Sequence, residues 1–173
     1  MKLEAGVAQT TNIEDFDDFF SRTFADVARA GALVARDRGT GQDLAQEAFF
    51  RLYERWREME SVEHARRFVY RVAINLARSH LRKHLRVRLS GLEPRARDTR
   101  MPLTDAWVEI ADALGHLSAR QRAAVVLVDY VGLDASEAAA VMRISSSTVR
   151  AHLMRGRRDL RLALSLPDEG APR

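Results

Sequence analysis

The placement of proline constrains the fold of this chain most strongly. Residues 1–93 and 103–166 contain none, and the chain has only four in all: Pro94, Pro102, Pro167 and Pro172. Proline interrupts helices and gathers in linkers and tails. The stretch 89–102 also has no apolar period. We therefore expect an all-α protein with two small helical domains, residues 12–88 and 103–166, joined by a flexible linker at 89–102.

Apolar residues recur at helical spacing in both expected domains. Phe16, Phe19, Phe20, Phe24 and Val27 form one stripe, as expected for a helix that begins near residue 12. Further helices are expected at 43–59, from Ser61 to about 88, around 107–114, after Ser118, at 135–142 and after Ser146. Ser118 with Gln121, and Asp134 with Glu137, have the spacing of capping boxes. No segment alternates with period two for long enough to predict a strand.

The charge is arranged in four alternating blocks. Residues 66–100 carry a net charge of +9 and residues 140–173 a net +4, while residues 1–65 carry −5 and residues 101–139 carry −4. Such asymmetry indicates two separate contacts with a polyanion, and two surfaces with other roles. Nucleic acid is the expected polyanion.

The second basic block predicts a helix-turn-helix, with two short helices joined by a short turn. The polar face of its last helix supplies the expected DNA contacts, in which short side chains allow close approach and arginines reach base edges or phosphates. These residues are Ser146, Ser147, Thr148, Arg150, Met154, Arg155 and Arg158. The alternative is an ordinary helical hairpin with a solvated basic face. Arg143 falls in the turn, where a positive φ would cost about 1 kcal/mol.

The first basic block mixes arginines with Phe68, Tyr70 and Asn75. Aromatic rings beside a basic groove can stack on unpaired bases, and Asn can hydrogen-bond a base edge. Nucleic-acid binding is the favoured interpretation of the arginines, against a solvated basic face. For Phe68 alone, a place in the hydrophobic core is favoured over stacking.

The acidic helix expected at 43–59 presents Asp43, Gln46, Glu47 and Phe50 on a face away from its apolar stripe. An exposed aromatic residue among acids suits a protein partner better than DNA. The alternative is a solvated face with one stray phenylalanine.

Together these segments resemble the extracytoplasmic-function (ECF) sigma factors of the sigma-70 class, over about residues 14–163. The resemblance lies in DLAQEAFFRLYERW, RRFVYRVAINLARSHLRKHLR and the 45 residues that begin LSARQRAAVVL. It implies that Asp43, Gln46, Glu47 and Phe50 bind core RNA polymerase. It implies that the −10 element is read by Phe68, Tyr70, Asn75, Arg78, Arg82 and Lys83. The last segment is expected to read the −35 element of promoter DNA, and an anti-sigma factor is a further expected partner. Ser79 and Arg143 depart from the family pattern, which has Asp and Gly at these places.

Several other functions are excluded by what the sequence lacks. The chain has no cysteine, so disulfides and thiolate sites are ruled out. His80 and His84 have the spacing of a metal-binding pair, but HExxH is absent, and we assign both to the DNA-facing block with no metal and no cofactor. No hydrolase or phosphate-loop motif occurs, so we expect no enzyme. The apolar runs are too short for a membrane span, and a cytoplasmic protein is expected. The rival function is a helix-turn-helix regulator that acts without core polymerase.

Overall fold

The computed structural model describes residues 15–89 and 105–164, which contain seven α-helices, two short irregular helical turns and no β-strand. The all-α prediction is therefore confirmed. In chain order the elements are α1 (Phe16–Ala35), α2 (Arg38–Tyr53), the 3₁₀ turn η1 (Trp56–Glu58), α3 (Val62–Leu89), α4 (Asp105–Gly115), α5 (Ala119–Val125), the π-helical turn η2 (Val126–Tyr130), α6 (Ala135–Met142) and α7 (Ser146–Ala163).

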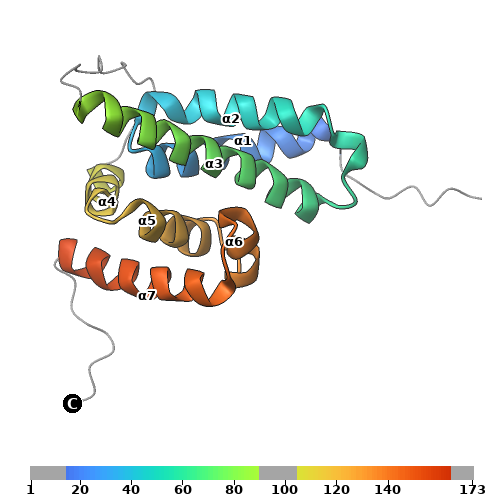
Figure 1. Ribbon diagram of the computed structural model, residues 1–173. Coiled ribbons are helices and arrows are strands. Elements are labelled where there is room, and N and C mark those ends of the chain that lie inside the picture. The colour runs from blue at the N-terminus through green and yellow to red at the C-terminus, as the bar shows by residue number, and fades with distance from the viewer. Residues whose placement is uncertain (1–14, 90–104, 165–173) are drawn as a thin grey trace, which may run out of the picture.

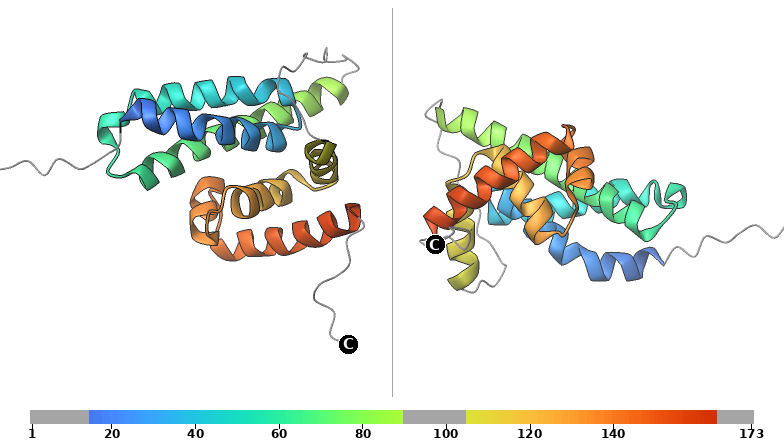
Figure 2. Two further views of the ribbon diagram at one scale, coloured as in Figure 1. Left: turned by 180° about the vertical axis from the view of Figure 1, so that it is seen from behind. Right: turned by 90° about the horizontal axis from the view of Figure 1, so that it is seen from below.

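The helices form two groups that pack together. Helices α1, α2 and α3 lie side by side, and α5 lies between this group and α7, which forms the opposite face of the molecule (Figures 1 and 2). Contacts between the groups run from α3 to α6 and from α1 to α5 and η2. None of the helices within 15–89 and 105–164 is long and apolar enough to cross a membrane.

The first group is built on the predicted apolar stripe of α1. Phe19 and Val27 are fully buried, whereas Phe20 at the edge of the stripe stays partly exposed. The helices α1 and α2 approach closely at Gly41, where an added Cβ would lie 2.5 Å from the Ala28 carbonyl oxygen. Only glycine fits this crossing.

The second group is framed by helix caps, as the sequence predicts. Ser118 with Gln121 and Asp134 with Glu137 both form complete capping boxes. The cap of α7, however, is Ser145 rather than Ser146, since the Ser145 hydroxyl accepts from the Thr148 amide at 3.2 Å. The prediction was one residue late because three consecutive serines offer the same chemistry.

Helix α2 begins five residues before the predicted start at residue 43. Asp37 caps it by accepting from the Gly39 amide at 3.0 Å and from the Thr40 hydroxyl at 2.8 Å. The first turn was not predicted because it contains glycines at positions 39 and 41, and glycine is a poor helix former. Ser61, in contrast, lies directly before α3 and accepts from the His64 amide, as expected for a cap.

A five-residue turn of π-helix, η2, follows α5. The Val131 amide donates to the Val126 carbonyl at 2.9 Å, five residues back. Gly132 then ends the helical run with a φ of 78°. The wider π turn was not predicted, since the apolar run 123–131 has no feature that separates it from α-helix.

The two groups are joined by a buried guanidinium. Arg122 in α5 is 2% exposed and donates to four carbonyl oxygens, those of Leu114 (2.8 Å), Leu117 (2.7 Å), Val34 (3.3 Å) and Gly115 (3.4 Å). Burial, with a smaller effect from Arg36, lowers the pKa of Arg122 to about 10, so that the side chain keeps its charge at neutral pH.

Two more arginines connect the groups along α3. Arg66 donates to the Val131 carbonyl, and Arg67 lies 3.3 Å from the Glu137 carboxylate. These bonds hold the end of η2 and the first turn of α6 against α3. Of the linker expected at 89–102, only Leu89 lies within the described residues, as the last residue of α3.

Candidate nucleic-acid and protein interfaces

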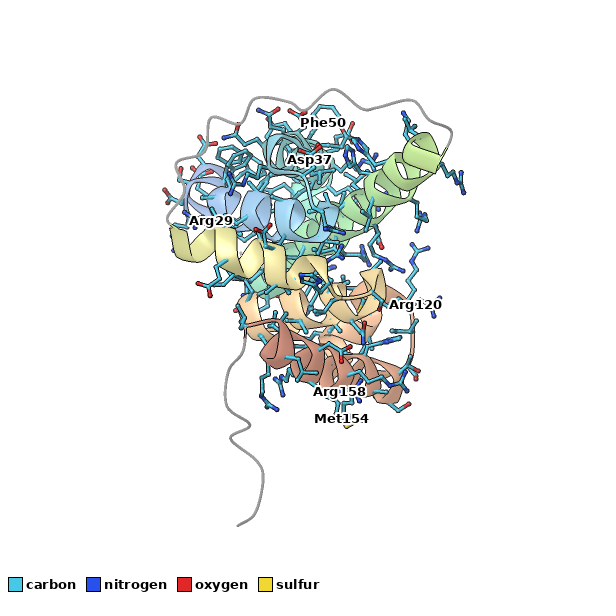
Figure 3. All side chains as sticks on the ribbon, turned by 90° about the vertical axis from the view of Figure 1, so that its left-hand side faces the viewer. Arg29, Asp37, Phe50, Arg120, Met154 and Arg158 are labelled. Atoms are coloured by element: carbon cyan, nitrogen blue, oxygen red, sulfur yellow. The ribbon has the colours of Figure 1, made fainter. Side chains whose placement is uncertain are left out.

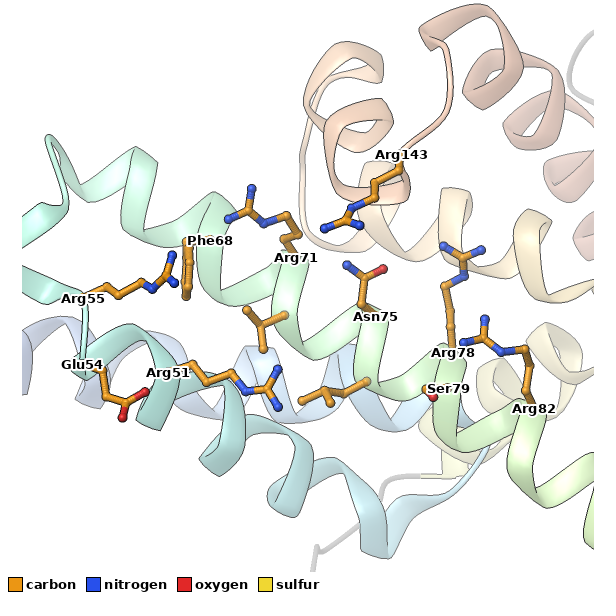
Figure 4. A pocket seen from close by; sticks show the side chains of 12 residues that line it. Arg51, Glu54, Arg55, Phe68, Arg71, Asn75, Arg78, Ser79, Arg82 and Arg143 are labelled. Carbon is orange, nitrogen blue, oxygen red and sulfur yellow. The ribbon is translucent and has the colours of Figure 1, made fainter.

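A basic groove of about 820 Å³ lies between α2, α3 and the turn that joins α6 to α7 (Figure 4). Six arginines and a single acid, Glu54, give its wall a strongly positive charge. The arginines are Arg51, Arg55, Arg71, Arg78, Arg82 and Arg143. Phe68, Asn75 and Ser79 also line the groove. Six residues of α3 are expected to read the −10 element. Besides Phe68, three more of them line this groove.

Asn75, Arg78 and Arg82 lie on its wall, about one helical turn apart. Burial lowers the pKa of Arg78, and nearby Arg82 and Arg120 lower it further. Such mutual repulsion among cations is relieved when an anion binds. The groove is therefore electrostatically suited to a phosphate backbone.

The two predicted aromatic residues have different positions. Phe68 is buried, as favoured from the sequence, yet it is among the residues that line the groove, and the Arg71 guanidinium lies 5.1 Å from its ring centre. Tyr70 is 3% exposed and belongs to the core, where burial raises its pKa to about 12. We therefore withdraw Tyr70 as a stacking residue, because its ring has no exposed face.

Lys83 and the two histidines of this block face elsewhere. They line a small separate pocket of about 130 Å³ together with Val87. Burial lowers the pKa of His80, and His84 lowers it further, while Asp37 opposes both. His80 and His84, which the sequence assigned to the DNA-facing block, therefore line this pocket and not the basic groove.

Arg143 links the helix-turn-helix to the groove. It ends α6 in the left-handed conformation, with a φ of 55°, so the positive φ considered from the sequence is observed. Its side chain extends from the turn toward Asn75 (Figure 4). An arginine in this turn therefore adds a cation to the α3 groove, which the glycine typical of the family would not.

The outer face of α7 carries all seven residues expected to contact duplex DNA. Ser147, Arg150, Met154, Arg155 and Arg158 are exposed, with Met154 at 67%, while Ser146 and Thr148 are half-buried in the first turn. Val149 and Leu153, on the opposite side of the helix, are buried. The position of α7 at the outside of the molecule leaves this face accessible (Figure 3).

Not every arginine of α7 faces outward freely. Arg157 donates through Nε to Asp129 of η2 at 3.1 Å, and so ties α7 to the π turn. Arg158 pairs with its neighbour Asp159 at 3.0 Å, but most of its side chain remains exposed. We therefore count Arg157 as a structural residue and retain Arg158 on the outer face.

The acidic face of α2 is exposed as predicted. Asp43, Gln46, Glu47 and Phe50 all point outward, and Phe50 is 60% exposed. Tyr53, which was not predicted, extends this face and is 64% exposed. Its spacing of three residues from Phe50 on the same helix was the available signal. Phe50 and Met154 lie at opposite ends of the molecule (Figure 3).

The sequence matches known families over both groups of helices. Residues 19–87 match Sigma-70 region 2, and residues 107–160 match Sigma-70, region 4. The sigma-C factor of Mycobacterium bovis is 30% identical over 157 residues, which cover 87% of this chain and 83% of that protein. The chain is an ECF sigma factor of the sigma-70 family. Sigma factors are regulatory proteins rather than catalysts.

Two further comparisons place this sigma factor among its relatives. The ECF sigma factor SigE of Mycolicibacterium smegmatis is 30% identical over 158 residues, or 83% of this chain and 60% of that protein. The chain thus spans less than two thirds of that relative. The sigma factor RpoE of Bartonella quintana, solved with the anti-sigma factor NepR, has the same fold, with a TM-score of 0.72 at 18% identity. That alignment covers 90% of this chain and 100% of the RpoE chain.

Proposed function

We propose that this sigma factor binds core RNA polymerase through α2 and directs it to promoters whose −35 and −10 elements it reads with α7 and with the α3 groove. The observation that carries the proposal is the groove of six arginines, which is built jointly by the end of α2, by α3 and by the turn of the helix-turn-helix. A strongly cationic groove suits a single DNA strand that has left the duplex. The neighbouring helix-turn-helix suits the adjacent DNA that is still double-stranded.

The −35 element is assigned to α7. A capped helix with exposed Ser147, Arg150 and Met154 in its first turns can enter a major groove, where Arg150 is placed to reach a base edge. Arg155 and Arg158, further along the same exposed face, are assigned to phosphates.

The −10 element is assigned to the groove. Asn75 offers a donor and an acceptor to a base edge, and Arg78 and Arg82 line the same wall for the backbone. Phe68 is only 7% exposed, so we assign it to the groove wall that holds an unstacked base rather than to stacking on a free aromatic face. Lys83 is assigned to more distant phosphate contacts, because it lies outside the groove.

Core polymerase is assigned to the exposed face of α2. Phe50 and Tyr53 supply an apolar centre, with Asp43, Gln46 and Glu47 around it. Aromatic residues ringed by polar ones are the usual anatomy of an interface hot spot. An anti-sigma factor that inhibits this protein is expected to cover the same face.

The first test separates base reading from general DNA affinity. Arg150→Ala should weaken binding to a promoter fragment by about 10- to 100-fold if Arg150 contacts a base. The same variant on a fragment with a scrambled −35 element should bind as the unchanged protein does. Equal loss on both fragments would make Arg150 a phosphate contact and contradict the assignment.

The second test separates a sigma factor from a regulator that acts without polymerase. Glu47→Lys reverses a charge on the exposed α2 face, and Glu109→Lys on exposed α4 is the matched control. We expect only Glu47→Lys to lose co-purification with core polymerase and run-off transcription. If the unchanged protein binds promoter DNA but never binds polymerase, the rival function is correct.

A further inference from the structure

Three side chains with metal-binding atoms meet where the start of α2 lies against the second half of α3. They are Asp37, His80 and His84, and one ligand atom from each lies within 4.8 Å of the others. His80 Nε2 is 3.4 Å from Asp37 Oδ2, and the two imidazole rings stack with centres 4.1 Å apart. The cluster is outside the basic groove and takes no part in the proposed DNA contacts.

The local structure explains why these three residues converge. His80 and His84 are one helical turn apart on α3, so both rings lie on the same side of the helix. Asp37 comes from another part of the chain, where it caps α2 and is held by the Gly39 amide and the Thr40 hydroxyl. The carboxylate is thus fixed in place before any ligand arrives.

An ion pair between His80 and Asp37 explains only part of this arrangement. It needs two groups and leaves His84 without a role, although the His84 ring stacks on that of His80. Two imidazoles in contact would repel each other if both were protonated. Two nitrogen donors and one oxygen donor that share a single centre are, however, the ligand set of catalytic-type zinc sites.

We propose that Asp37, His80 and His84 bind one divalent cation of the Zn²⁺ class. Mixed imidazole and carboxylate donors favour Zn²⁺, Ni²⁺ or Cu²⁺ over Mg²⁺ and Ca²⁺, which prefer oxygen ligands. All three side chains are partly exposed and the histidines line a small pocket, so water can complete the coordination. This proposal goes beyond the sigma-factor function and does not depend on it.

The surroundings set an upper limit to the affinity. Lys83 lies on the rim of the same pocket, and its ammonium group repels a cation. With three protein ligands and an adjacent positive charge, the site should bind more weakly than a closed four-ligand structural zinc site. A bound ion would fasten the start of α2 to the second half of α3.

The experiment is a titration of the full chain, freed of any histidine tag and of chelator, with ZnCl₂ by isothermal calorimetry. We expect one ion per chain, and no binding in a parallel titration with MgCl₂. His84→Ala and Asp37→Asn should each weaken zinc binding at least tenfold. Asn can still cap α2, so that variant tests the ligand rather than the fold. His116→Ala on the exposed loop after α4 is the matched control and should bind zinc unchanged.

Thermal unfolding gives an independent readout. Because the ion binds only the folded chain, excess ZnCl₂ should raise the melting temperature of the unchanged protein and the His116→Ala variant by several degrees. The rise should be clearly smaller for His84→Ala, because its zinc binding is weaker. Zinc binding of equal affinity in His84→Ala, or no binding by the unchanged protein, would overturn the proposal.

Discussion

Replacement of Arg122 by methionine tests the bond network that joins the two groups of helices. Methionine matches the length of the arginine stem but cannot donate, so four carbonyl oxygens lose their partner. Three of them belong to the segment that ends α4 and leads to α5. The fourth, at Val34, belongs to the last turn of α1.

The magnitude follows from opposing effects. A hydrogen bond from a charged donor contributes about 1.5–3 kcal/mol, so four would give about 6–12 kcal/mol. Two of the four are long, at 3.3 and 3.4 Å, and burial of a guanidinium costs several kcal/mol, which methionine avoids. We therefore expect Arg122→Met to lower the free energy of unfolding by about 3–5 kcal/mol. For a chain of this length the melting temperature should fall by about 10 °C.

The assay is urea unfolding followed by circular dichroism at 222 nm, with the slope of the transition fitted as well as its midpoint. Arg120→Met is the matched control, because Arg120 lies on the same helix but is exposed. Its effect should stay within about 0.5 kcal/mol. If the two variants unfold at the same urea concentration, Arg122 does not stabilise the fold and the reasoning is refuted.

Three further predictions concern the backbone. In urea unfolding, Arg143→Gly should raise the free energy of unfolding by up to about 1 kcal/mol, because glycine relieves the left-handed strain. Binding of single-stranded DNA to the groove should weaken in the same variant. A loss of stability would contradict this prediction. Gly41→Ala should lower the free energy of unfolding by at least about 2 kcal/mol in the same assay, since its Cβ would collide with the Ala28 carbonyl; a neutral result would mean that α1 and α2 can separate freely. Asp134→Ala breaks the capping box with Glu137 and should lower the free energy of unfolding by about 1 kcal/mol, measured as a fall in melting temperature. An unchanged melting temperature would show that the capping box does not stabilise the fold.

The parts of the fold that the sequence predicted well are those set by local chemistry. The two capping boxes and the positive φ at Arg143 each depend on a few neighbouring residues, and the structure contains all of them. The all-α fold follows in the same way from helical apolar spacing and the absence of proline. Exposure of the α7 face was predictable because Val149 and Leu153 fix which side turns inward.

The features that the sequence did not predict depend on contacts between distant segments. Arg122 directly precedes an apolar run, and its role depends on carbonyls up to 88 residues away. Tyr70 was placed on the DNA side because aromatic and basic residues alternate there, yet packing against the other helices buries it. Asp37 joins His80 and His84 only once α2 is packed on α3, so a search for local metal motifs could not find it.

The π turn at η2 holds one residue more than an α-helical turn would use over the same stretch. Removal of one residue between positions 126 and 130 could therefore be absorbed by a return to ordinary helix, with the segments before and after it kept in place. The same deletion inside α5 or α7 would rotate everything that follows by about 100°. The π turn is thus a point within the helical run at which the chain can lose one residue while the packing on either side is kept.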